Sequence, residues 1–123
     1  MKGESEEEQK GSFRVALGYY NKALLSLKML FDDQRINDEK TAAKYIFDIE
    51  LPVCLNLALC YIKTDLPHYG IKYSSQVIDK NLPEIQTYIP TLEKAYYRRG
   101  LCYFKIGHND QAKSDLNKCI TLA

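Results

Sequence analysis

Apolar residues recur three and four positions apart along most of the chain, and no stretch alternates apolar and polar residues with a period of two. One stripe in the first third consists of Leu17, Tyr20, Leu24, Leu27 and Phe31. Later stripes consist of Cys54, Leu57, Ala58, Tyr61 and Ile62, and of Leu101, Phe104, Leu116 and Ile120. Because this spacing places apolar side chains on one face of a helix, the sequence predicts an all-α fold built from amphipathic helices.

The stripes contain an internal repeat of residue types at fixed gaps. The last third has the series Tyr96, Gly100, Tyr103, Ala112, Leu116 and Cys119. The middle third has a series with identical gaps, Cys54, Ala58, Tyr61, Gly70, Ser74 and Val77. The first third shows the second half of the unit, as Ala16, Tyr20 and Ala23. Each unit predicts two helices joined by a tight turn, with its small residues where the two helices cross closely.

Residues that favour turns separate the two helices of each unit. The turn is expected at Ile106–Asn109 in the last unit and at Thr64–Pro67 in the middle unit. In the first unit we expect it at Lys10–Ser12.

This pattern resembles the tetratricopeptide repeat, a helix-turn-helix unit of 34 residues. Residues 94–123, KAYYRRGLCYFKIGHNDQAKSDLNKCITLA, match the repeat without a gap, and residues 54–78 match it less fully. The resemblance implies a right-handed superhelix of antiparallel helix pairs, a solenoid of about three repeats. Such a superhelix has a groove, lined by the first helix of each unit, in which an extended peptide is held.

The spacing between equivalent positions predicts insertions within one domain at 1–123. Ala16 and Gly70 are 54 residues apart, and Gly70 and Ala112 are 42 apart, both more than one repeat length. The expected units are repeat 1 at about 1–31 with an incomplete first helix, a helical extension at about 32–50, repeat 2 at about 51–82, an insertion at about 83–90, and repeat 3 at about 91–123. We expect the extension to lengthen two helices around a turn near Asp32-Asp33 or Asn37-Asp38.

Lengthened helices of this kind are similar to the tetratricopeptide domains of FK506-binding immunophilins and other heat-shock co-chaperones. The strings CLNLALCYIK and KAYYRRG are also similar to segments of that family. The family's carboxylate clamp holds the acidic C-terminal tail of heat-shock chaperones of the 70 and 90 kDa classes. By position, Asn56, Lys94 and Arg98 match three of its five members. Arg can grip a carboxylate with two parallel hydrogen bonds, Lys supplies a point charge, and Asn donates an amide N–H.

The first two clamp members match less well. Counting back from Ala16 without a gap puts Ser5 at the Asn position, whereas a one-residue deletion brings Lys2 to the Lys position. The run Gly3–Gln9 has no apolar residue, so we expect the first helix to be truncated, replaced or disordered there. Lys63 and Lys105 hold equivalent positions in their repeats and are further candidates at one end of the groove. Arg99 is expected to face away and to form an interhelix salt bridge or lie on the surface.

Composition narrows the function classes. The formal net charge of the 123 residues is +1, so no overall field favours nucleic acid. No apolar run reaches the roughly 18–20 residues of a membrane span, and the polar start shows no signal peptide. The four cysteines form no C-x-x-C and lie in apolar runs, which predicts buried thiols in a reducing, cytoplasmic setting with no metal or cofactor. His68 and His108 are expected in exposed turns.

The sequence shows no phosphate-binding loop, nucleophile elbow or metalloprotease motif, so it predicts an interaction module and not an enzyme. The first hypothesis is a co-chaperone module that binds an acidic chaperone C-terminus through the clamp. The second is a tetratricopeptide scaffold that binds another protein without a clamp, through the face away from the groove, the Leu82–Pro90 segment or the long helices. The third is part of a larger peptidyl-prolyl isomerase with its catalytic domain elsewhere. An apolar end face at Leu116, Ile120 and Leu122 is also expected to favour self-association.

Overall fold

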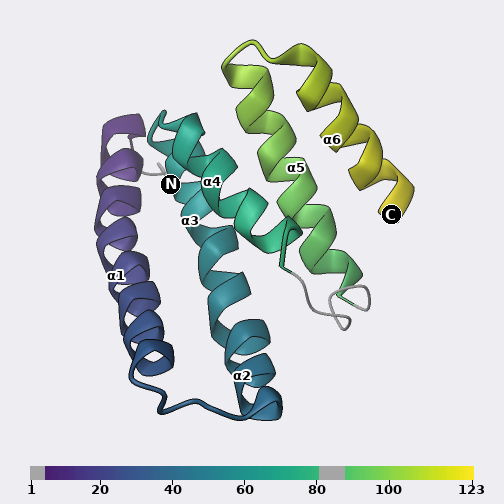
Figure 1. Ribbon diagram of the computed structural model, residues 1–123. Coiled ribbons are helices and arrows are strands. Elements are labelled where there is room, and N and C mark those ends of the chain that lie inside the picture. Colours follow the sequence, from purple (N-terminus) through teal and green to yellow (C-terminus); the bar gives the residue numbers. More distant parts are fainter. Residues whose placement is uncertain (1–4, 81–87) are drawn as a thin grey trace.

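The computed structural model describes residues 5–80 and 88–123, and within those ranges every regular element is a helix (Figure 1). The elements in chain order are α1 (Glu6–Asp32), α2 (Glu39–Tyr45), the π-helical segment η1 (Ile46–Glu50), α3 (Leu51–Lys63), α4 (Pro67–Ile78), α5 (Ile89–Lys105) and α6 (Asn109–Leu122). The predicted all-α fold of antiparallel helix pairs is confirmed. The pairs are α3–α4 and α5–α6; α5 also packs on α3 and α4, and α1 packs on α3.

The small residues of the repeat lie where helices cross closely, as predicted. A Cβ added at Gly70 of α4 would come within 2.5 Å of the Cys102 Sγ on α5. A Cβ at Gly100 of α5 would come within 3.0 Å of the Leu116 side chain on α6. Real Cβ atoms essentially never lie 2.5 Å from another atom, so a larger residue at Gly70 would force a shift, and at 3.0 Å a Cβ at Gly100 would press on the Leu116 side chain. These two contacts set the spacing of the last three helices.

Three helices end with the same backbone turn, in which one residue has a positive φ. That residue is Gln34 after α1 (φ 58°), Asp65 after α3 (φ 60°) and Gly107 after α5 (φ 83°). In each turn its N–H donates to the carbonyl three residues back, and the next N–H donates to the carbonyl five residues back. This pattern closes the carbonyl end of a helix. It confirms the predicted turns at Thr64–Pro67 and Ile106–Asn109.

The turn expected at Lys10–Ser12 is wrong, because these residues lie inside α1. The helix begins at a reciprocal cap, in which the Ser5 Oγ accepts a hydrogen bond from the Glu8 N–H (3.2 Å) and the Glu8 carboxylate accepts one from the Ser5 N–H (3.3 Å). This capping box starts the helix, and an interior Gly11 costs it only about 1 kcal/mol, so nothing forces a break. Residues 6–12 are therefore helical, and no separate first helix of the first unit occurs among the described residues.

Residues 39–63 form one continuous helical rod made of α2, η1 and α3. Pro52 lies within it and has no N–H to donate to the carbonyl four residues earlier, that of Asp48. The chain accommodates this proline with a π-type turn, in which the Leu51 N–H donates to the Ile46 carbonyl five residues back. The turn between α1 and this rod occupies residues 33–38, between Asp32 and Glu39.

By length and composition alone, this rod could cross a membrane, since an 18-residue window within Glu39–Lys63 has a mean hydropathy of 1.5. An uninterrupted apolar run of that length does not occur in the rod, because Asp48 and Glu50 lie within it; only the mean hydropathy of the window is high. The criterion is weak evidence for a span, since a central core helix also meets it. Here 39% of the window is buried inside the fold, and α3 contacts α1, α4 and α5.

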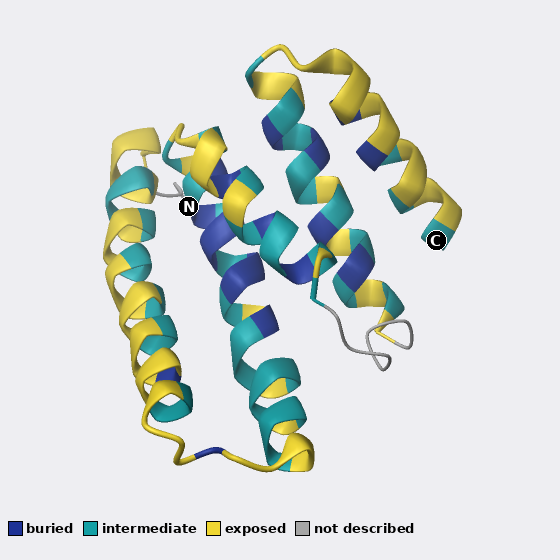
Figure 2. Cartoon of the chain, in the orientation of Figure 1, coloured by how far each residue is buried: buried dark blue, intermediate teal, exposed yellow. Residues whose placement is uncertain are grey.

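The core lies between α3, α4 and α5, where the buried residues concentrate (Figure 2). Its central cluster is Leu51, Cys54, Leu55, Val77, Leu92 and Ala95. Cys54, Cys60 and Cys102 are buried free thiols and Cys119 is half-buried, which confirms the predicted burial for three of the four. Burial raises the pKa of Cys54 to about 12 and that of Cys102 to about 11, so both thiols stay protonated at neutral pH.

Candidate peptide-binding groove

One face of α5 carries four residues at positions i, i+4, i+7 and i+11, which helical geometry places in a single row. They are Lys94, Arg98, Leu101 and Lys105. The neighbouring helix α3 carries Asn56 and Lys63, seven positions apart and so on one face as well. Lys94, Lys63 and Lys105 are exposed, whereas Asn56 and Arg98 are half-buried. These two rows of α3 and α5 contain most of the residues predicted to bind a ligand.

Arg98 joins the two rows directly. Its Nη1 donates a hydrogen bond of 2.7 Å to the main-chain carbonyl of Leu55, which immediately precedes Asn56 on α3. Burial lowers the pKa of Arg98, while the nearby Cys60 thiol acts in the opposite direction. Because an arginine stays charged far above neutral pH, the guanidinium remains a full cation. The Leu55 carbonyl therefore holds the Arg98 guanidinium against α3, one residue before Asn56 in the sequence.

Arg99, the next residue, points to a different helix. Its Nε and Nη2 each donate a 2.8 Å hydrogen bond to one carboxylate oxygen of Asp115 on α6, and its Nη1 donates to the Ser75 hydroxyl at 3.2 Å. The rings of Tyr96 and Tyr103 flank its guanidinium at 5.6 and 5.9 Å. The hydrogen bonds to Asp115 raise the pKa of Arg99. Of the two expected roles, the structure assigns the interhelix salt bridge.

Lys63 and Lys105 lie together at one end of this groove, in a cavity of about 410 Å³. The apolar part of its lining is Phe13, Ile62 and Leu101. Its polar lining also includes Glu6, Gln9, Lys10 and Asp65. The Lys10 Nζ lies 2.9 Å from a carboxylate oxygen of Asp65, which ties α1 to the turn after α3. We call this space the lysine cavity.

Residues 93–123 match the family model of the tetratricopeptide repeat. The match covers most of α5 and all of α6, the helix pair with the close crossing at Gly100. No solved structure matches the chain. Tetratricopeptide repeats are protein–protein interaction modules and are generally not enzymes, so this part of the chain indicates a protein partner.

The two remaining candidate residues, Ser5 and Lys2, give different outcomes. Ser5 uses its hydroxyl to cap α1 through the Glu8 N–H, so the structure assigns it a role in the helix start. It is not among the residues that line the lysine cavity. Lys2 lies outside the described residues, as does most of the predicted insertion at 83–90.

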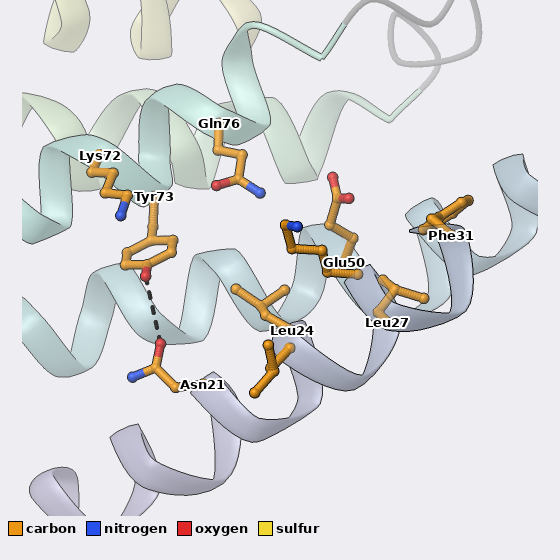
Figure 3. A pocket seen from close by; sticks show the side chains of 10 residues that line it. Asn21, Leu24, Leu27, Phe31, Glu50, Lys72, Tyr73 and Gln76 are labelled. Atoms are coloured by element: carbon orange, nitrogen blue, oxygen red, sulfur yellow. Dashed lines mark hydrogen bonds between the residues drawn. The ribbon is translucent and has the colours of Figure 1, made fainter. Parts of the chain in front are cut away.

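A larger cavity, of about 510 Å³, lies between α1 and α4 and was not foreseen from the sequence (Figure 3). Leu24, Leu27 and Phe31 of α1 supply its apolar side. Tyr73 and Gln76 of α4 face them, and the Tyr73 hydroxyl donates to the Asn21 Oδ1 at 3.5 Å. Glu50, which forms an ion pair with Lys80, also lines the space. No sequence motif marks this cavity, because it depends on how α1 lies against α4.

The other polar residues form no chemical centre in the described part of the chain. His68 is exposed, as expected, but it lies inside helix α4 and not in the loop before it, because the helix begins at Pro67. His108 is exposed in the turn before α6 and stacks on Tyr103, with 6.1 Å between ring centroids. Among residues 5–80 and 88–123, no group of three metal-ligating side chains comes together.

The end face formed by α5 and α6 exposes apolar side chains. Ile120 is 72% exposed and Phe104 is 66% exposed, while Leu116 and Leu122 are half-buried. Self-association through this face stays a prediction.

Proposed function

We propose that this chain binds the acidic C-terminal peptide of a heat-shock chaperone, with Arg98, Lys94 and Asn56 gripping the terminal carboxylate. The observation that carries the proposal is the Arg98–Leu55 hydrogen bond, which fixes a cationic fork beside Asn56 on the neighbouring helix. An arginine held in this way loses little side-chain entropy when it binds, which favours a carboxylate ligand.

The chemistry of the three residues suits a carboxylate. Arg98 uses one of its five N–H donors on Leu55 and keeps others for a ligand. Lys94 lies one turn earlier on the same face and is exposed, so its ammonium can swing toward the same anion. Asn56 follows the carbonyl that holds Arg98 and can donate its amide N–H. Charge-assisted hydrogen bonds of this kind are about twice as strong as neutral ones.

The likeness to the carboxylate clamp of co-chaperones, including FK506-binding immunophilins, supports the chaperone tail as the ligand. This chain supplies three of the five clamp positions from described residues. Since α1 runs straight through the place where a first turn was expected, we propose a three-residue clamp with an affinity weaker than that of a five-residue one.

A second candidate function is a scaffold that binds another protein without using the clamp. The cavity between α1 and α4 favours it, because this space combines an apolar side with amide and ammonium groups at its rim. Helix α1, which supplies the apolar side of this cavity, also exposes the apolar side chains of Val15, Tyr19 and Met29.

The deciding experiment is a titration with an acetylated pentapeptide that ends in Glu-Glu-Val-Asp, beside the same peptide with an amidated C-terminus. We expect the free carboxylate to bind and amidation to weaken binding. Arg98→Ala should weaken it by about 1.5–3 kcal/mol, or about 10- to 150-fold, the range for a hydrogen bond to a charged group. Lys118→Ala removes the same charge from an exposed site on α6 and should leave the affinity unchanged.

Binding that ignores both amidation and Arg98→Ala would reject the clamp. If Leu24→Lys, which places a charge in the cavity between α1 and α4, then weakens the binding of a partner protein, the scaffold function gains support. Circular dichroism of each variant establishes that the fold is intact.

A further inference from the structure

We infer that Glu6 is a specificity-determining residue of the groove, which disfavours ligand carboxylates in the lysine cavity. This inference rests on the proposed function, because it concerns the residues upstream of the terminal carboxylate in the same ligand.

Glu6 belongs to the first turn of α1 and lines the lysine cavity together with Lys63 and Lys105. Three residues of α1 that share its face, at i+3, i+4 and i+7, also line the cavity: Gln9, Lys10 and Phe13. This face of α1 is therefore directed at the cavity, and the Glu6 carboxylate is placed at the end of the groove.

Two contacts keep Glu6 in that position. The capping box between Ser5 and Glu8 fixes the first turn of α1 as helix. One turn later, the ion pair between Lys10 and Asp65 ties the helix to the turn that follows α3. Asp65 stands in that turn with a φ of 60°, so its backbone direction is set by the helix cap. The first turn of α1 is thus fixed as helix by its own cap, and the Lys10–Asp65 ion pair attaches that end of the helix to the turn after α3.

The charges in the cavity decide what Glu6 does there. Lys10 and Asp65 neutralise each other, and their pairing raises the pKa of Lys10 and lowers that of Asp65. Lys63 and Lys105 would then present two positive charges to a ligand, and Glu6 reduces that sum by one. A ligand carboxylate entering the cavity gains attraction from two lysines and meets repulsion from Glu6. A neutral side chain feels neither effect.

A peptide gripped at Arg98 can reach this cavity. Arg98 and Lys105 are seven residues apart on α5, which is about 10 Å at 1.5 Å per residue. An extended peptide covers that distance with about three residues. In a ligand ending in Glu-Glu-Val-Asp, the two glutamates therefore fall within reach of the lysine cavity and of Glu6.

The test compares two peptides on two matched variants. The peptides are acetylated and end in Glu-Glu-Val-Asp or in Gln-Gln-Val-Asp. The variants are Glu6→Gln and Glu7→Gln, which remove the same charge from neighbouring exposed residues of one helix turn, of which only Glu6 lines the cavity. Glu8 is avoided because it caps the helix.

We expect Glu6→Gln to tighten binding of the glutamate peptide about three- to fivefold at low salt, the scale of an exposed charge pair. The glutamine peptide should change by less than about 1.5-fold, and Glu7→Gln should change neither peptide by more than that. The gain should shrink at 0.5 M salt, where charges are screened over a few ångströms. Adding Lys63→Gln to Glu6→Gln should remove it.

The inference is overturned if Glu6→Gln and Glu7→Gln behave alike, or if Glu6→Gln tightens both peptides equally. If amidation still weakens binding in that case, the clamp stands and the role of Glu6 alone fails. If the peptides bind no variant at millimolar concentration, or amidation has no effect, the proposed function and this inference fail together.

Discussion

The helix pair α5–α6 and the single helix α1 have similar amphipathic sequences but differ in how many of their faces are covered by other helices. In α5–α6 each helix covers a face of the other, and the pair is held by the crossing at Gly100 and the buried link between Arg99 and Asp115. Helix α1, of 27 residues, packs one face on α3 and buries a single residue, Leu27 (Figure 2). On its other faces it exposes Val15, Tyr19, Leu25 and Met29. One neighbouring helix is therefore enough to cover one face of an amphipathic helix, whereas burial of a second face needs a second neighbour.

The largest effect that separates the two regions concerns their salt bridges. Asp115→Ala should destabilise the fold by about 3–5 kcal/mol, because it leaves the mostly buried Arg99 without its partner. Asp32→Ala breaks a pair with Lys28 of the same 2.8 Å length on α1, but both of its side chains are more than 60% exposed. We expect no change in the urea midpoint from Asp32→Ala. Equal losses in the two variants would contradict the contrast.

Glycine substitutions should have opposite signs in the two regions. Gly100→Ala should destabilise by about 1–2 kcal/mol, since the added Cβ would press on Leu116. Gly18→Ala on α1 meets nothing within 4 Å and should stabilise by about 0.5–1 kcal/mol through helix propensity. Thermal unfolding of the two variants against the parent chain gives both signs. A loss of stability in Gly18→Ala would mean that α1 has a partner on that face.

The helix-ending turns offer a third, smaller contrast. Gln34 after α1 and Gly107 after α5 share the same hydrogen-bond pattern and a positive φ. Gln34→Gly should stabilise by about 0.5–1 kcal/mol and Gly107→Ala should destabilise by a similar amount, because only glycine adopts this conformation without strain. Urea titrations at one temperature measure both. The comparison is refuted if Gln34→Gly destabilises the chain.

The smallest effect is a pH dependence at the start of α1. The pKa of Asp65 is lowered by its hydrogen bond to Lys10, so this contact is present above the ordinary aspartate pKa and is lost as the pH falls through the lowered value. The pKa of Lys10 is raised, so the contact is also lost as the pH rises past that value. Hydrogen exchange at residues 9–13 should therefore be slowest near neutral pH and faster at pH 3 after correction for intrinsic rates. Asp65→Asn should remove this difference.

The helix pairs and their turns were predictable from sequence because their signals are local. Small residues at fixed gaps mark the crossings at Gly70 and Gly100, and Gly107 marks a turn through its own conformational freedom. The turn expected at Lys10–Ser12 rested on residue types that favour turns without requiring them. The capping box at Ser5, five residues upstream, decided the outcome.

The arrangement around the groove was only partly predictable. The residues of the two rows follow from helical spacing, but the hydrogen bond from Arg98 to the Leu55 carbonyl depends on how closely α5 lies against α3. The position of Glu6 in the lysine cavity depends on the path of the whole of α1, which no local pattern specifies. The cavity between α1 and α4 depends on the same path and was missed for the same reason.

The π turn ahead of Pro52 divides the 25-residue rod of α2, η1 and α3 into two parts that are rotated relative to each other about the rod axis. Each residue advances an α-helix by about 100°, so the extra residue that a π turn accommodates offsets everything before it by about that angle. The residues of α2 that point toward the core are therefore about 100° away from those expected if the α-helical spacing of α3 continued through η1. Phe47, which belongs to the π turn η1, stacks on Tyr88 at the start of α5, with 4.2 Å between ring centroids. Removing one residue from η1 would act as a rotation of α2 about its own axis, with the length of the rod almost unchanged.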